Sequence, residues 1–169
     1  MKKILLLILI CTSFTGFAQD VDSTEKTTTF YLISNGEKKE PSEKYPDPYL
    51  SDAGVSRAEN WVKVLANVAF DGVYAQNLIS VKQTAQIVGT SKELGVFELD
   101  TNTLYDAAFK YTTNGKSNLI VADNATLVKF ANSVVGEEKF KVSEDVNYSN
   151  LYIISVTKNG KETILLDIN

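Results

Sequence analysis

The stretch from Asn118 to Ala122 contains Leu-Ile-Val in succession, with no polar residue alternating between the apolar ones. A strand with one face in water alternates apolar and polar side chains, whereas a strand covered on both faces is apolar throughout. Thr28 to Ile33 is a second run suited to a buried strand, built from β-branched and aromatic residues. Since buried strands need helices above and below them, these two runs predict a parallel sheet inside an α/β domain.

The rest of the chain alternates between helical and extended patterns. Helices are predicted where apolar residues recur at helical spacing: from an N-cap at Ser51 to residue 66, and at 81–94, 104–111 and 125–135. Further strands are predicted at 70–75, 96–99, 151–156 and 163–168. The last two flank Lys158-Asn159-Gly160-Lys161 and form a hairpin. This order predicts a three-layer αβα domain with a mostly parallel central sheet and an antiparallel C-terminal edge.

The N-terminus has the pattern of a secretory signal peptide. Lys2 and Lys3 precede the apolar run from Ile4 to Ile10, and Gly16-Phe17-Ala18 supplies small residues for cleavage. The predicted organisation is a signal peptide at 1–18, a polar tether at 19–27 and one domain at 28–169. The exported protein is expected in the periplasm or outside the cell. The apolar run is too short to span a bilayer, which argues against a membrane anchor, and no later apolar segment is long enough to cross a membrane, so no membrane insertion is expected after cleavage.

Composition excludes several kinds of chemistry. The chain has no histidine, and its single cysteine, Cys11, lies in the predicted signal peptide. Histidine-based nucleophilic or acid–base catalysis and Cys/His zinc sites are therefore excluded. The net charge is −4, and removal of Lys2 and Lys3 takes it to −6, which argues against nucleic-acid binding. No cofactor is expected.

Two loops are predicted to form the ligand crevice, because the carboxyl ends of parallel strands meet at one edge of a sheet. They are residues 34–49 after the first strand and residues 123–125 after the fourth. The first contains all three prolines of the chain and no alternating apolar pattern in its early part, so it is predicted to be a long surface loop.

Five segments, in this order, resemble the histidine phosphatase superfamily, in its phosphoglycerate-mutase-like branch. The match begins with the strand ending in Ser34-Asn35-Gly36-Glu37-Lys38, where that family has Arg-His-Gly or Arg-His-Ala. The other segments are Asp47 to Gly54, Phe70 to Ala75, Gln83-Thr84-Ala85, and Leu119 to Asn124. The resemblance implies a phosphoglycerate-mutase-like fold over residues 28–169, and for a typical member a phosphoric monoester hydrolase or phosphomutase.

The departures from the family pattern fall on its phosphate pocket. By the resemblance, Ser34 and Ser80 stand at the places of two arginines, and Asn35 and Asp123 at the places of two histidines. An amide is a poor nucleophile because its nitrogen lone pair is delocalised, and a carboxylate repels a phosphate dianion. The degenerate positions Ser34, Asn35, Ser80 and Asp123 therefore predict loss of both catalysis and phosphate affinity.

Two interpretations of the function follow. The first is a secreted pseudophosphatase that acts as a binding or accessory module for a small molecule or a protein. The second is a hydrolase with replaced chemistry in the old crevice, assisted by a divalent metal. Asn35, Asn124, Glu37 and Asp123 carry the oxygen ligands that Ca²⁺ or Mg²⁺ prefers, and Glu37 and Asp123 are the metal candidates. The first interpretation, in which the chain is not an enzyme, is favoured, and the second, in which it is a hydrolase, stays open.

Overall fold

The computed structural model of the protein describes residues 26–143 and 147–168. The elements within these ranges are β1 (Thr28–Ser34), α1 (Asp52–Val64), β2 (Gly72–Ala75), α2 (Ile79–Ser91), β3 (Val96–Glu98), α3 (Ala107–Thr113), β4 (Ser117–Ala122), α4 (Asn124–Val135), β5 (Asn150–Thr157) and β6 (Gly160–Asp167). The predicted signal peptide and most of the predicted tether lie outside the described residues.

The strands form one six-stranded sheet of order β3-β2-β4-β1-β5-β6. The first four strands of this order are parallel, whereas β5 pairs antiparallel with β1, and β6 with β5. The predicted α/β class, the mostly parallel sheet and the antiparallel C-terminal edge are therefore confirmed. No helix in the described ranges is long and apolar enough to cross a membrane.

Strand β4 lies between β2 and β1, as its apolar run predicted. Leu119, Ile120 and Val121 are fully buried. Leu119 and Val121 belong to one hydrophobic cluster and Ile120 to another, because successive side chains of a strand point to opposite faces of the sheet.

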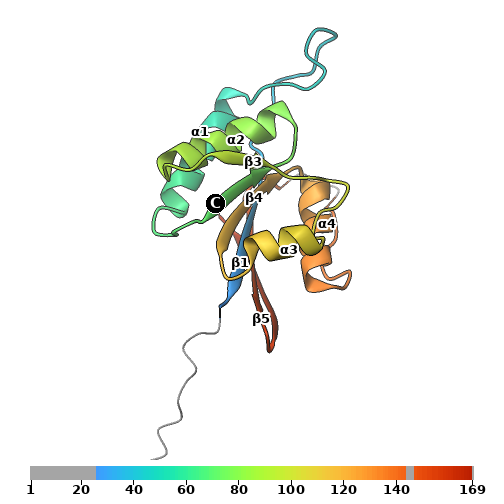
Figure 1. Ribbon diagram of the computed structural model, residues 1–169. Coiled ribbons are helices and arrows are strands. Elements are labelled where there is room, and N and C mark those ends of the chain that lie inside the picture. The colour runs from blue at the N-terminus through green and yellow to red at the C-terminus, as the bar shows by residue number, and fades with distance from the viewer. Residues whose placement is uncertain (1–25, 144–146, 169) are drawn as a thin grey trace, which may run out of the picture.

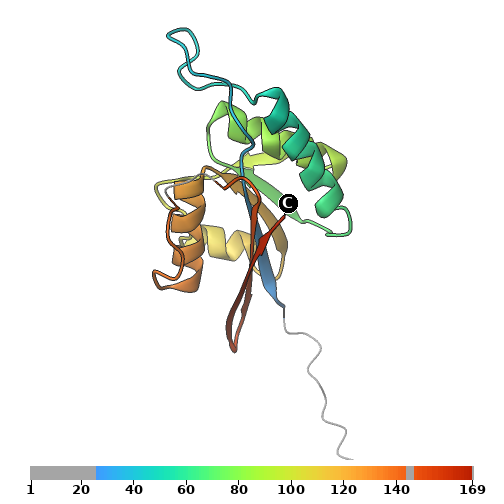
Figure 2. The ribbon, with the colours of Figure 1, turned by 180° about the vertical axis from the view of Figure 1, so that it is seen from behind.

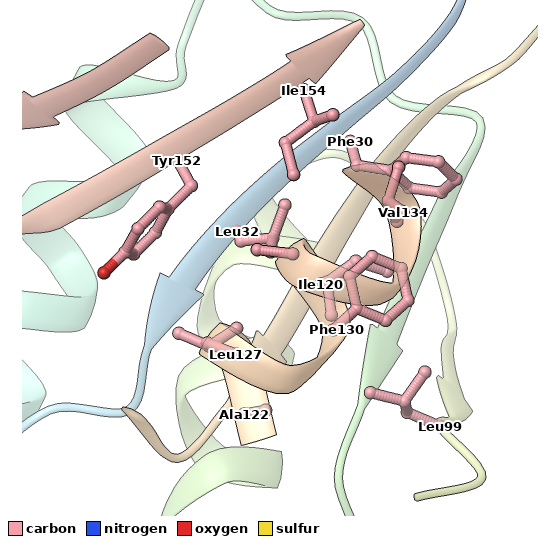
Figure 3. Close-up of a cluster of buried hydrophobic side chains, with 11 residues drawn as sticks. Phe30, Leu32, Leu99, Ile120, Ala122, Leu127, Phe130, Val134, Tyr152 and Ile154 are labelled. Atoms are coloured by element: carbon pink, nitrogen blue, oxygen red, sulfur yellow. The ribbon is translucent and has the colours of Figure 1, made fainter. Parts of the chain in front are cut away.

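The helices form two layers, one on each face of the sheet (Figures 1 and 2). On one face α1 contributes Trp61, its C-cap contributes Leu65 and α2 contributes Val88 to the cluster that contains Leu119. On the other face lie α3 and α4 (Figure 1). Figure 3 shows this second cluster, in which Phe130 of α4 packs near Phe30 of β1.

Several element boundaries differ from the predictions for local reasons. Helix α2 begins at Ile79 rather than at residue 81, because Asp47 Oδ2 accepts a hydrogen bond from the Ile79 N–H at 2.8 Å. Helix α3 begins at Ala107 rather than at residue 104, because Asp106 caps it and accepts from the Phe109 N–H. The hairpin turn contains only two residues, so β6 begins at Gly160 rather than at residue 163.

Backbone hydrogen bonds join the two ends of the loop after β1. The Lys39 N–H donates to the Tyr49 carbonyl, and the Ser51 N–H donates to the Glu37 carbonyl, both at 2.9 Å. The tip of this loop projects away from the body of the domain (Figures 1 and 2). The long surface loop predicted from the sequence is confirmed.

Candidate functional site

The carboxyl ends of β1 and β4 share a cavity of about 280 Å³. As predicted, the loops that follow these two strands meet there, since each contributes residues to the same walls. The lining residues are Ser34, Asn35, Lys38, Asp123, Asn124, Ala125, Val142, Ser143 and Tyr148.

Asp123 is the best-anchored side chain of the cavity. It is the N-cap of α4, and its Oδ1 accepts from the Thr126 N–H at 2.7 Å. Its Oδ2 accepts from Gln76 Nε2 at 3.0 Å, and the Asp123 N–H donates to Gln76 Oε1 at 2.9 Å. Burial raises the pKa of Asp123, but the hydrogen bonds from Thr126 and Gln76 and the charge of Lys38 outweigh it and hold this pKa below its usual 3.8.

Replacing Asp123 by asparagine should therefore remove a pH-dependent part of the stability. Because the pKa is lower in the folded protein, the ionised carboxylate stabilises the fold fully above about pH 4, and this stabilisation is lost as the pH falls through the folded-state pKa. We expect Asp123→Asn to be less stable than the wild type at neutral pH, with the difference closing in acid. Urea unfolding from pH 2 to pH 7 measures it, and a difference that stays constant with pH would contradict the assignment.

Asn35 follows β1, the strand beside β4, and its side chain is turned onto its own backbone. Nδ2 donates to the Gly36 carbonyl at 2.8 Å, and only 4% of the residue is exposed. The neighbouring Ser34 is also buried, and its Oγ has no hydrogen-bond partner among the described residues. Two predicted pocket positions therefore lie beside the cavity with little exposed polar surface of their own.

Ser80 does not line this cavity. It is buried in the first turn of α2, and its carbonyl accepts from Thr84 Oγ1 at 3.0 Å. Thr84 Oγ1 in turn accepts from the Gly36 N–H at 3.3 Å. The structure thus connects Ser80 to the loop after β1 through Thr84, but it does not bring Ser80 to the cavity wall.

The Glu37 side chain binds Arg57 and does not line the cavity. Its carboxylate accepts three hydrogen bonds from the Arg57 guanidinium of α1, at 2.6 to 3.0 Å. These hydrogen bonds hold the pKa of Glu37 below its usual 4.5, against the opposing effect of burial. Glu37 does not line the cavity with Asp123, so the two metal candidates are not brought together. Across residues 26–143 and 147–168, no three His, Cys, Asp or Glu side chains cluster as metal ligands.

Lys38 and Tyr148 are among the lining residues that were not singled out from the sequence. Lys38 contributes a cation to the cavity, although the sequence signal for it was no more than its place three residues after Asn35. Tyr148 comes from the segment before β5 and stacks near Arg57, with the guanidinium carbon 5.8 Å from the ring centroid. No pattern in the sequence connects Tyr148 to residues so distant along the chain.

Comparison with known proteins identifies the architecture. No family model matches the sequence, and no curated protein sequence matches it. Among solved structures, the protein histidine phosphatase SixA complexed with tungstate matches with a TM-score of 0.65 at 11% identity, over 82% of this chain and 96% of that one. The alpha-ribazole phosphatase from Shigella flexneri matches with a TM-score of 0.62 at 16% identity, over 83% and 98%.

A phosphoglycerate mutase from Bacillus anthracis str. Sterne matches with a TM-score of 0.61 at 13% identity, over 86% of this chain and 95% of that one. This chain has the histidine-phosphatase fold. The match covers nearly the whole of each neighbour, so the predicted phosphoglycerate-mutase-like architecture is confirmed. In the histidine-phosphatase fold of this chain, the cavity between Asn35 and Asp123 lies at the carboxyl edge of the sheet, where α/β domains bind ligands.

Proposed function

We propose that this protein is an exported, non-catalytic relative of the histidine phosphatases that binds a small molecule or a protein. The observation that supports this most directly is the position of the Asp123 carboxylate. It accepts from the Thr126 N–H at the N-terminus of α4 on the wall of the cavity, so the chain's own anion takes a hydrogen bond that an incoming anion would use.

Helix N-termini are anion sites because their first N–H groups lack partners within the helix and carry partial positive charge. Asp123 takes this role at α4, and Asp47 takes it at α2 through the Ile79 N–H. A phosphate dianion entering the cavity would meet the charge of Asp123 directly. Lys38 is the only cationic residue on the walls formed by the described residues, and its charge helps to lower the pKa of that same carboxylate.

The reaction of the fold's active members also lacks its nucleophile here. Their chemistry, as the resemblance implies, passes through a phosphorylated histidine, and this chain has none. Asn35 stands at the corresponding place, with its amide hydrogen-bonded to the Gly36 carbonyl. An amide has no ionisation near neutral pH that would make its nitrogen nucleophilic.

The cavity that remains has mixed polarity. Lys38 and Asp123 supply one charge of each sign, and Asn124 and Tyr148 supply uncharged polar groups. Such walls suit a zwitterionic group better than a dianion, because each charge of a zwitterion can lie near a wall residue of opposite charge. They also suit an uncharged polar group, which Asp123 does not repel. The ligand of this module is therefore expected to carry no phosphate.

The proposal predicts that the purified exported form neither hydrolyses phosphate monoesters nor binds oxyanions. Turnover of p-nitrophenyl phosphate should not exceed that of an Asn35→Ala variant. Titration calorimetry with tungstate, the ion held by the SixA neighbour, should show no saturable heat. The protein should be expressed with its full N-terminus, so that sequencing of the product also tests export: the first residue should be Gln19.

Each outcome separates one part of the proposal. Turnover that disappears in Asn35→Ala, or saturable tungstate binding that disappears in Lys38→Ala, would overturn the non-catalytic module. A product that keeps Met1 and stays in the cytoplasm would overturn export alone. Asp123→Asn serves as the matched variant for electrostatics, since weak tungstate binding gained by that change supports the repulsion argued for the carboxylate.

A further inference from the structure

Strand β6 forms an outer edge of the sheet and carries three exposed apolar residues. It is the last strand of the sheet, and in Figures 1 and 2 it belongs to the red hairpin that extends from the domain. Ile164, Leu165 and Leu166 are 53%, 49% and 41% exposed. Unpaired edges of this kind invite pairing with another strand, and proteins that stay monomeric usually protect them with charges, bulges or proline.

The hydrogen-bond pattern of the hairpin shows which backbone groups face outward. The Ile168 N–H donates to the Ser149 carbonyl at 2.9 Å, and Gly160 pairs with Thr157 directly beside the two-residue turn. Residue pairs of an antiparallel ladder alternate between hydrogen-bonded and non-hydrogen-bonded. Since Gly160 and Ile168 belong to hydrogen-bonded pairs, the even-numbered residues of β6 form hydrogen bonds with β5. The outward N–H and C=O groups are those of Lys161, Thr163, Leu165 and Asp167.

We propose that a second copy of this chain pairs with this edge, antiparallel, about a two-fold axis at Ile164. This register places Thr163 opposite Leu165 and Lys161 opposite Asp167 of the other copy. All four outward-facing residues then lie in hydrogen-bonded pairs, and two six-stranded sheets become one continuous sheet. The two Ile164 side chains face each other at the axis.

Charge complementarity favours a second copy over an unrelated strand. The edge carries a cation near its start, at Lys161, and an anion at its end, at Asp167, so the strand complements its own reverse. Shifting the register by two residues in either direction separates this pair, and shifting it by one residue misaligns the backbone donors and acceptors. Lys161 Nζ donates to the Val135 carbonyl at 3.0 Å, and its remaining donors are available to the carboxylate of the other copy.

A cysteine crosslink tests the register. The exported chain lacks cysteine, because Cys11 lies in the predicted signal peptide, so Ile164→Cys introduces a single thiol. At the axis the two thiols face each other in a non-bonded pair, with Cα atoms about 4.5 Å apart, and mild oxidation should give a covalent dimer. Glu162→Cys is the matched control on the same strand and face. Its two copies would lie about 13 Å apart along the strands, too far for a disulfide.

Sedimentation analysis over a concentration series tests the association itself. The wild type should reach twice the chain mass. Asp167→Lys should raise the dissociation constant about tenfold, since two opposite-charge pairs become like-charge pairs. The double variant Lys161→Asp, Asp167→Lys should restore it. Thr163→Pro removes an outward N–H while leaving the hairpin bonds in place, and it should yield monomer with an unchanged circular dichroism spectrum.

Three results would overturn the dimer. They are a monomeric wild type up to millimolar concentration, assembly that continues beyond two copies, and crosslinking of Glu162→Cys in preference to Ile164→Cys. A monomeric wild type would mean that the edge is free or covered by another segment of the same chain. Assembly beyond two copies would mean that the edge is an aggregation site. Preferred crosslinking of Glu162→Cys would mean that the two-fold axis lies elsewhere on the strand.

Discussion

Replacing Gly54 by alanine should destabilise the protein by about 3 kcal/mol, the upper part of the range for forcing an extra carbon into a packed site. A Cβ at Gly54 would lie 2.1 Å from the Glu37 carbonyl oxygen and 2.9 Å from the Glu37 nitrogen. The Glu37 backbone cannot move aside easily, because its carbonyl accepts from the Ser51 N–H and its carboxylate is held by Arg57.

The sign of this effect is informative because Gly54 lies in the first turn of α1. Within a helix, alanine is normally about 1 kcal/mol more favourable than glycine. A loss of stability would therefore show that the close contact with the loop after β1 outweighs the helix preference of alanine. Gly95→Ala is the matched control, since a Cβ there meets no atom within 4 Å. Urea unfolding of both variants measures the difference in the free energy of unfolding. Equal stabilities of Gly54→Ala and Gly95→Ala would show that the loop after β1 can move away from α1 without loss of stability.

This contact also bears on the candidate site. The same loop carries Asn35 and Lys38 to the cavity wall, and it packs Gly36 against Gly54, where a Cβ on Gly36 would lie only 2.5 Å from the Gly54 carbonyl oxygen. The two glycines let the loop and the start of α1 approach backbone to backbone. A Gly54→Ala variant that remains folded should therefore also show a displaced Lys38 and a weaker influence of that lysine on the pKa of Asp123.

The layered architecture could be predicted from the sequence because its signals are local. Uninterrupted apolar runs marked β1 and β4, helical spacing marked α1, α2 and α4, and Gly136 ends α4 in the left-handed conformation that glycine favours. The meeting of Asn35 with Asp123 could also be predicted, since both follow parallel strands that end at the same edge.

The contacts that shape the cavity could not be predicted, because they join residues distant in the chain. Asp123 pairs with Gln76 across 47 positions, and Asp47 caps α2 across 32. The Glu37–Arg57 pair, which separates one metal candidate from the other, depends on where the loop crosses α1. None of these pairs produces a periodic pattern in the sequence. The sequence therefore predicted Glu37 in the crevice, and it did not indicate Lys38 or Tyr148.

Phe30→Ala should cost about 4 kcal/mol, as large-to-small changes of buried aromatic residues do. Phe30 is fully buried on β1 and belongs to the cluster in Figure 3. Its ring packs edge-on against Tyr105 and Phe130, with centroids 5.7 and 5.4 Å apart, and stacks on Phe109 at 6.2 Å. These rings come from α3, α4 and the segment before α3, so truncation removes the contacts that join one helical layer to the sheet.

The matched control is Phe97→Ala, which removes the same atoms from a ring that is 59% exposed on the edge strand β3. Its cost should stay below about 1 kcal/mol, as for most surface substitutions. Chemical denaturation followed by circular dichroism compares the two variants under one set of conditions. Comparable losses would mean that the α3–α4 layer adds little to the stability of the sheet. The cavity beside Asp123 would then have to be held in place by the α1–α2 layer and the loop hydrogen bonds alone.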